Sequence, residues 1–258
     1  MGNIIKAMNY QIKNDKVTYF CVLLSVFLSC SNLVGCDLSE VTGGSFISMA
    51  GDMTALLPMF VILILSVRIC GWDYTDKTIN YEILAGHHRR DVYFARAVLA
   101  IVWSVLICLV CMLVPVFIFT AINGWGDTME FKGMMLRFAL SFFPMLRITS
   151  QYILLVFLTR NVYISWGAGY MATMFSMMIN MMIKEFLSFE FTWHFSSSNL
   201  MKIFTFNQSL GYVNNEDVVI CQTSLESSFV AGTIVASLVI SLICIGFGYI
   251  FFKKSDIS

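Results

Sequence analysis

The groups that could perform acid, base or metal chemistry are few in this chain, and they lie outside its long apolar segments. The only histidines are His87, His88 and His194, and each falls in a predicted loop. No apolar segment carries Asp, Glu or His in its interior, where ion-coupled carriers commonly place ionisable groups. The eight cysteines follow no metal-ligand spacing. We therefore expect no catalytic or metal site in the chain, and ion-coupled transport is disfavoured.

Arg147 is the one charge placed well inside an apolar segment, where it follows Pro144 by three residues. A guanidinium at membrane depth is costly unless it faces water, a partner or a pathway. Two interpretations stay open: Arg147 faces a ligand or gate, or it is a structural charge whose head reaches the outer headgroups.

A methionine stripe follows in the next apolar segment. Thioethers bind copper(I), but no cysteine or histidine completes a ligand set here, so an adaptable packing or substrate-lining surface is the better interpretation. Together with Arg147 we assign to a translocation path the four methionines that follow the spacing of one helix face: Met171, Met174, Met178 and Met181.

The stretch from Trp72 to Arg96 is the densest charge cluster in the chain. Asp73 or Thr75 is predicted to cap a short helix that Gly86 ends, and Asp91 to cap the helix after it. The short helix would carry an apolar side and lie across the inner mouth of a bundle, where a cytoplasmic partner could bind. Its apolar side consists of Ile79, Ile83 and Leu84.

Six apolar segments would position these residues, and each is near the length of about 20 residues that a membrane helix needs. Hydrophobic residues make up 58% of the chain, charged residues 12%, and the mean hydropathy is +0.78. The prediction is an all-α membrane protein with six transmembrane helices, at Val17–Gly35, Thr54–Gly71, Arg96–Ile122, Leu136–Leu158, Val162–Ile183 and Ser228–Phe252.

Charge fixes the expected orientation. If both termini are cytoplasmic, the predicted outer loops hold few of the 16 Lys and Arg residues, which is the positive-inside pattern. The chain then forms one transmembrane domain, 1–258, with an inner-surface helix at 1–16, a coupling segment at 72–95 and an outer segment at 184–227. The cations of the outer loops are Lys132, Arg137, Lys184 and Lys202.

Two alternatives concern Cys36. The sequence Leu33-Val34-Gly35-Cys36 resembles a lipoprotein cleavage box, but the preceding apolar run is longer than a usual signal core, so we favour a first transmembrane helix. Cys36 and Cys221 are the only pair that falls in predicted outer loops. They are expected to be free thiols, with a disulfide as the alternative.

The whole arrangement resembles the permease subunits of type-2 ABC transporters, a class of bacterial six-span exporters. The resemblance rests on an inner-surface helix, six spans, a helix between the second and third span, and a structured outer segment before the last. Its local matches are Asp73-Tyr74-Thr75-Asp76-Lys77-Thr78-Ile79, in which Lys77 stands where glycine is usual, and Arg90-Asp91-Val92-Tyr93 with Arg96.

The resemblance implies that a separate ATP-binding subunit docks on the coupling segment and that ATP and magnesium belong to that subunit. The chain itself has no Gly-Lys dipeptide and therefore no phosphate-binding loop. A second permease copy is expected, as a homodimer rather than a heterodimer, in the bacterial cytoplasmic membrane, and no nucleic acid is expected. The expected contact residues are Asp73, Thr75, Asp76, Lys77, Thr78, Ile79, Tyr81, Glu82, Ile83 and Leu84.

The substrate is less constrained. Permeases of this size resemble exporters of amphipathic peptides such as phenol-soluble modulins or lantibiotics, while drugs, lipids or sodium stay open. Two other function classes compete: a non-transport membrane scaffold, which binds a partner without ATP-driven transport, and an ion-coupled carrier, which transports alone.

Overall fold

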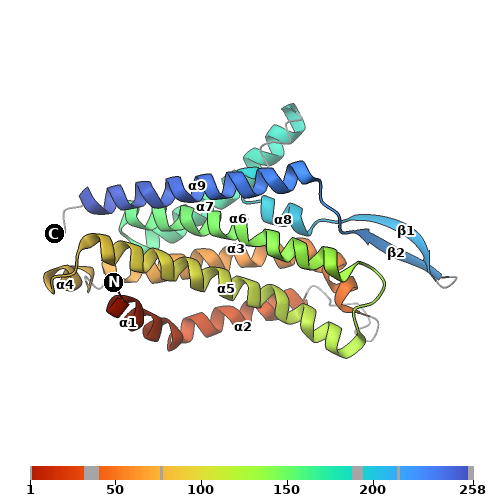
Figure 1. Cartoon of the computed structure of the whole chain (residues 1–258), viewed down its shortest axis with the longest axis horizontal. Coiled ribbons are helices and arrows are strands. Elements are labelled where there is room, and N and C mark those ends of the chain that lie inside the picture. The colour runs from red at the N-terminus through yellow and green to blue at the C-terminus, as the bar shows by residue number, and fades with distance from the viewer. Residues whose placement is uncertain (1, 32–40, 76–77, 188–193, 214–215, 255–258) are drawn as a thin grey trace.

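The protein is a bundle of long helices with a short hairpin at one end (Figure 1). The structure, a computed structural model, describes residues 2–31, 41–75, 78–187, 194–213 and 216–254. The long helices coincide with the six predicted apolar segments, although α3 and α5 extend well beyond them. They are α2 (Lys16–Ser31), α3 (Gly43–Thr75), α5 (Arg89–Asn123), α6 (Phe131–Thr159), α7 (Val162–Leu187) and α9 (Ser227–Lys254).

The prediction of a helical membrane protein is confirmed in this coarse form. Within the described residues, α5, α6 and α9 are each long and apolar enough to cross a membrane, and Lys16–Leu28 and Leu57–Trp72 are shorter apolar helices. Six spans and the orientation of the termini stay predictions. The two termini and α4 (Thr78–Leu84) lie at one end of the bundle, and the hairpin lies at the other (Figure 1).

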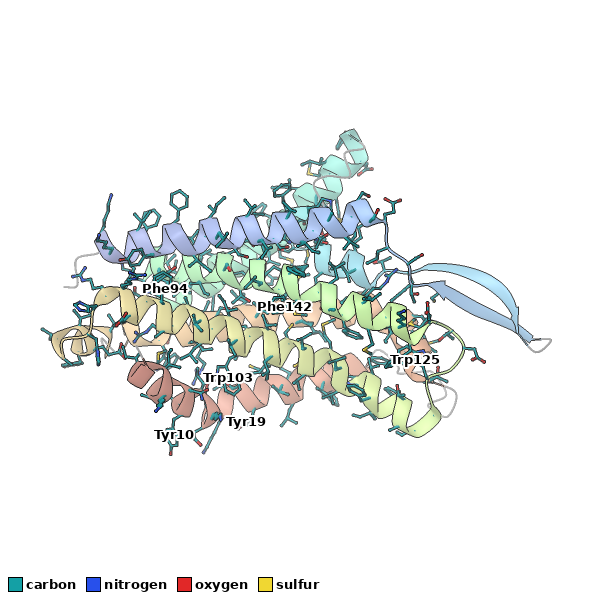
Figure 2. The ribbon with its side chains drawn as sticks, viewed as in Figure 1. Tyr10, Tyr19, Phe94, Trp103, Trp125 and Phe142 are labelled. Atoms are coloured by element: carbon teal, nitrogen blue, oxygen red, sulfur yellow. The ribbon has the colours of Figure 1, made fainter. Side chains whose placement is uncertain are left out.

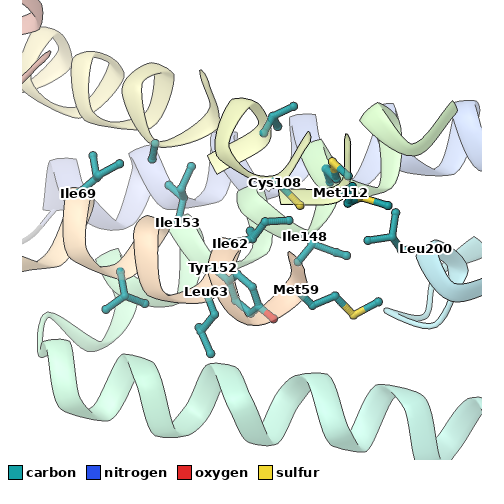
Figure 3. Packing of buried hydrophobic residues seen from close by; sticks show 14 of the residues in the cluster. Met59, Ile62, Leu63, Ile69, Cys108, Met112, Ile148, Tyr152, Ile153 and Leu200 are labelled. Atoms are coloured by element: carbon teal, nitrogen blue, oxygen red, sulfur yellow. The ribbon is translucent and has the colours of Figure 1, made fainter. Parts of the chain in front are cut away.

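The core lies where α3, α5, α6 and α9 pack together, with α6–α9 and α3–α5 the most extensive helix pairs. Figure 3 shows buried side chains of α3, α5 and α6 meeting there, among them Met59, Met112 and Ile148. Leu200 of α8 (Asn199–Phe204) closes this cluster toward the hairpin end. The core therefore runs from the middle of the bundle to the segment that follows α7.

The first helix, α1 (Gly2–Lys13), turns its apolar side to the bundle. Ile4, Met8 and Ile12 are buried in the core cluster, and the place of this helix on the inner membrane surface stays a prediction. The indole of Trp103 on α5 donates a hydrogen bond of 3.0 Å to Asn9. In Figure 2, Tyr10 points away from the bundle while Trp103 lies between α5 and the N-terminal helices. Packing against the protein therefore accounts for the amphipathic pattern of α1.

The strict all-α prediction missed a β-hairpin. Strands β1 (Asn207–Val213) and β2 (Glu216–Gln222) pair antiparallel, with Asn207 opposite Gln222. The signal was present in the sequence, because β-branched and aromatic residues flank the pair Asn214–Asn215, which is typical of a hairpin turn. Residues 214–215 themselves lie outside the described part.

Candidate functional site

The predicted coupling segment folds as a short helix, but its start differs from the prediction. Helix α3 continues to Thr75, so Asp73 and Thr75 belong to its last turn. Thr78 opens α4, while Asp76 and Lys77 lie outside the described residues. As predicted, the helix ends before Gly86, whose φ of 88° suits glycine.

The apolar side of α4 is turned differently from the expected docking face. Ile79 is only 3% exposed and belongs to the core, and Ile83 packs against that core. Tyr81 and Leu84 are instead 70% and 81% exposed, and their spacing of three residues places them on one face. A partner approaching α4 would therefore meet Tyr81 and Leu84 rather than Ile79.

An ion pair holds α4 against the bundle. Arg96 of α5 is fully buried and donates from Nη1 to the carboxylate of Glu82 at 2.7 Å. Glu82 thus anchors the helix. Asp91 does not cap α5 as predicted, because His88 occupies the cap position and Asp91 lies in the first turn, where its N–H donates to His88.

Helix α7 turns its methionine stripe away from this chain's own core. Met171, Met178 and Met181 are exposed and Met174 is half-buried. The opposite face is fixed to the bundle by a hydrogen bond between Tyr152 and Thr173, and Tyr152 can be followed in Figure 3. The stripe and Arg147 therefore do not meet within one chain.

Arg147 is fully buried, at 0% exposed. Its Nη2 donates a 2.6 Å hydrogen bond to the carbonyl of Ser196, which lies in the segment after α7. Among the described residues, its Nε and Nη1 find no acceptor. The guanidinium is therefore enclosed by protein within this chain, and both interpretations of Arg147 stay predictions.

The segment His194–Asn199 forms a polar wedge at the hairpin end of the bundle, and all its residues except Phe195 are buried. Serines attach it to α7. The hydroxyl of Ser196 donates to the Ser176 carbonyl at 3.1 Å, and the Ser176 hydroxyl donates to Ser197 at 2.9 Å. Asn180 donates from Nδ2 to Ser198 at 3.2 Å. We call this segment the polar wedge.

The other side of the polar wedge contacts α9. Nδ1 of His194 and the Thr233 hydroxyl are 3.2 Å apart, and Asn199 donates to the same hydroxyl at 3.4 Å. The close approach requires glycine at position 232, because a Cβ there would lie 2.7 Å from the His194 ring. Burial lowers the pKa of His194, and the charges of Lys202 and Arg147 lower it further, so the imidazole is neutral at neutral pH.

Sequence reasoning did not single out the polar wedge. It assigned this stretch only to the outer segment at 184–227, of which residues 188–193 lie outside the described residues. The signal that could have found it is the run Ser196-Ser197-Ser198-Asn199, since side chains of these types form hydrogen bonds when they are buried.

A small cavity opens between α7 and the polar wedge, with a volume of about 260 Å³. Its lining residues are Ser176, Ile179, Asn180, Ile183, Phe195 and Ser196. The described residues include no cluster of three or more His, Cys, Asp or Glu that could hold a metal. The serine, asparagine and arginine side chains gathered here can recognise a group by hydrogen bonds and charge.

Arg137 is a further buried cation that the sequence assigned only to an outer loop. It lies inside α6 and donates to the carbonyls of Ile203 at 2.7 Å, Thr205 at 3.1 Å and Thr223 at 2.8 Å. Thr205 precedes β1 and Thr223 follows β2. Arg137 thus clamps both ends of the hairpin to the bundle.

Cys221 is a free, buried thiol whose pKa is raised by burial. Cys36, its predicted alternative partner in a disulfide, lies outside the described residues.

Comparison with known proteins adds no family. No protein-family model matches the chain, and no curated protein matches it.

Proposed function

We propose that this chain is the transmembrane subunit of an ATP-driven exporter of the type-2 ABC class. It forms the translocation path in the bacterial cytoplasmic membrane with six transmembrane helices and cytoplasmic termini. A separate ATP-binding subunit hydrolyses ATP with magnesium and docks on α4.

The observation that carries this proposal is the exposed pair Tyr81 and Leu84 on a helix that is held in place by the ion pair between Glu82 and the buried Arg96. Large apolar side chains exposed at the solvent end of a bundle mark a protein contact. Because α4 is anchored to α5, a partner that moves α4 would also move the bundle.

The expected assembly contains two permease copies, with the exposed methionine stripe of α7 facing the shared path. Thioethers adapt to variable apolar surfaces, which suits amphipathic peptides as cargo. Drugs, lipids and sodium are the alternative substrates, and a non-transport scaffold is the alternative function.

The decisive experiment is a mild-detergent pull-down of the tagged chain from its native membrane, with mass spectrometry of the copurified proteins. The variant Tyr81→Asp/Leu84→Asp charges the exposed face of α4 without touching its buried side. Tyr10→Asp on α1 is the matched control, because Tyr10 is 74% exposed at the same end.

The proposal predicts a stoichiometric ATP-binding protein with the wild type and with Tyr10→Asp, and its loss with the double variant. An ATP-binding protein that stays bound to the double variant would remove α4 as the docking site. Its absence from the wild-type sample, under conditions that preserve known complexes, would favour a scaffold or a self-contained carrier.

A further inference from the structure

Buried hydrogen-bond donors of Arg147, next to the polar wedge, have no acceptor among the described residues. Nε and Nη1 of Arg147 carry three N–H bonds between them, and no described residue accepts from either atom. No described carboxylate is hydrogen-bonded to Arg147; its one bond goes to a backbone carbonyl. A buried charge without a counter-charge destabilises a fold, and such a group marks a functional site in a membrane protein.

Acceptors without donors lie in the same cluster. Oδ1 of Asn180 and Oδ1 of Asn199 are both buried and have no partner in the described part of the chain. Each of these amides uses its Nδ2 within the cluster, on Ser198 and Thr233 respectively. The site is therefore complementary to a group that both accepts and donates hydrogen bonds.

Arg147 is one of two cations near His194. Burial lowers the pKa of His194, and the charges of Lys202 and Arg147 lower it further. Among the described residues no carboxylate is hydrogen-bonded to Arg147, so a single negative charge would complement its guanidinium.

The cavity beside the polar wedge supplies room and an apolar wall. Ile179, Ile183 and Phe195 line it together with Ser176, Asn180 and Ser196, and almost all of the lining is apolar. Arg147 is not a lining residue and reaches the cavity wall through its hydrogen bond to the Ser196 carbonyl. The volume suits a group of the size of one amino-acid residue.

We propose that Arg147 anchors a binding site for a carboxylate next to an amide N–H on an apolar residue, which is the chemistry of a peptide C-terminus. The guanidinium receives the carboxylate, the carbonyl of Asn180 accepts from the amide, and the isoleucines pack against the apolar side chain. Its interpretation as a substrate site rests on the proposed function, whereas binding itself can be measured on the isolated chain.

The test uses the full chain in lipid nanodiscs and three small probes. N-acetyl-leucine carries the free carboxylate and the amide, N-acetyl-leucinamide lacks the charge, and octanoate has the carboxylate on an apolar chain without the amide. Binding is followed by titration calorimetry and by the midpoint of thermal unfolding, with Arg147→Gln as the variant. Arg137→Gln is the matched control, because Arg137 is a buried arginine of the same helix that is already bonded to backbone carbonyls.

We expect N-acetyl-leucine to raise the unfolding midpoint and to bind at least about tenfold more tightly than N-acetyl-leucinamide, the difference of one charge-assisted hydrogen bond. Arg147→Gln loses this preference and Arg137→Gln keeps it. Without probe, Arg147→Gln unfolds no earlier than the wild type, because it removes a buried charge and keeps a donor for the Ser196 carbonyl.

Equal binding of the acid and the amide to the wild type would overturn the proposal, whether or not the variant folds. Unchanged binding of N-acetyl-leucine to Arg147→Gln would overturn it as well. If octanoate binds as tightly as N-acetyl-leucine, the amide is not recognised, and the ligand would be a fatty-acid carboxylate rather than a peptide C-terminus. None of these results bears on the copurified ATP-binding protein, so the two proposals fail separately.

Discussion

Arg96, Arg137 and Arg147 are all buried in the bundle, and they differ in how fully their charge is compensated. Arg96 meets a carboxylate, Arg137 meets backbone carbonyls, and Arg147 meets a single carbonyl. The partner decides how a substitution changes the stability of the fold. Removing the carboxylate of an ion pair leaves a buried cation without a counter-charge, which destabilises the fold. A buried cation that already lacks a counter-charge can be replaced by a neutral residue without loss of stability.

Glu82→Gln is therefore expected to destabilise the protein by about 1–3 kcal/mol, because buried Arg96 loses its carboxylate. Partial exposure of Glu82 keeps the effect below that of a fully buried pair. Chemical unfolding in detergent measures it. The double variant Glu82→Gln/Arg96→Met should recover part of the loss, and strictly additive effects would show that the two residues are not coupled.

Asp15 gives a pH dependence. Its carboxylate accepts from Arg68 at 2.5 and 2.9 Å, between α1 and the bundle. Burial acts to raise the pKa of Asp15, but the hydrogen bonds from Arg68 and from the Val17 N–H outweigh it, so the pKa lies below the usual 3.8. A lowered folded-state pKa contributes stability at higher pH, which is lost as the pH falls through that pKa.

We expect the wild type to be more stable than Asp15→Asn at neutral pH, and the difference to shrink as the solution is acidified below pH 3.8. Thermal unfolding across pH measures both proteins. If the difference in stability between the two proteins does not change with pH, Asp15 contributes through packing and neutral hydrogen bonds rather than through its charge.

At the scale of elements, short segments are attached to long helices by a few polar contacts. The ion pair of Glu82 attaches α4, Trp103 attaches α1, Arg68 attaches the turn after α1 through Asp15, and Arg137 attaches the hairpin. The mobility of each short segment should therefore depend on these few anchoring side chains.

Arg137→Met should loosen the hairpin, because the carbonyls of Thr205 and Thr223 at its two ends lose a shared donor. Hydrogen exchange of the amides in β1 and β2 should become faster, while exchange in the middle of α5 stays unchanged. Arg147→Gln serves as a control, since its guanidinium does not contact the ends of the hairpin. Equal protection of the hairpin in wild type and Arg137→Met would refute the clamp.

The sequence predicted the long helices well, because each apolar run is longer than any buried segment of a soluble domain of this size would require. It identified Gly86 as a helix end and Arg147 as exceptional for local reasons. The exposed face of α4 and the hydrogen bond between Arg147 and Ser196 could not be predicted from the sequence. Both depend on which helices become neighbours, and residues 49 positions apart meet in the second case.

At the scale of the whole molecule, large apolar side chains cover outward faces of α2 and α7. On α7 the exposed residues include Tyr163, Tyr170, Met178 and Met181. Lipid can cover such a face, but α7 differs from α2 in its methionines. The proposed second copy would meet this face.

Cysteine cross-linking tests that contact. Met178→Cys in the membrane should form a dimer-sized product with an oxidant or short bifunctional reagent, whereas Leu242→Cys on α9 should not, although Leu242 is 72% exposed. The wild-type chain is the background, and its described cysteines are buried. Equal cross-linking at both positions would indicate random collision, and none at Met178 would place the second copy elsewhere.

The packing of α9 against α6 bears on how the chain is made. Helix α9 is synthesised after α6 and the polar wedge, yet α6 makes its most extensive helix contact with α9, and the polar wedge needs Thr233 of α9 for its hydrogen bonds. Until α9 has been made, α6 and the polar wedge lack these contacts. A nascent chain that stops before Ser227 would be a natural target for the proteases that remove unfinished membrane proteins.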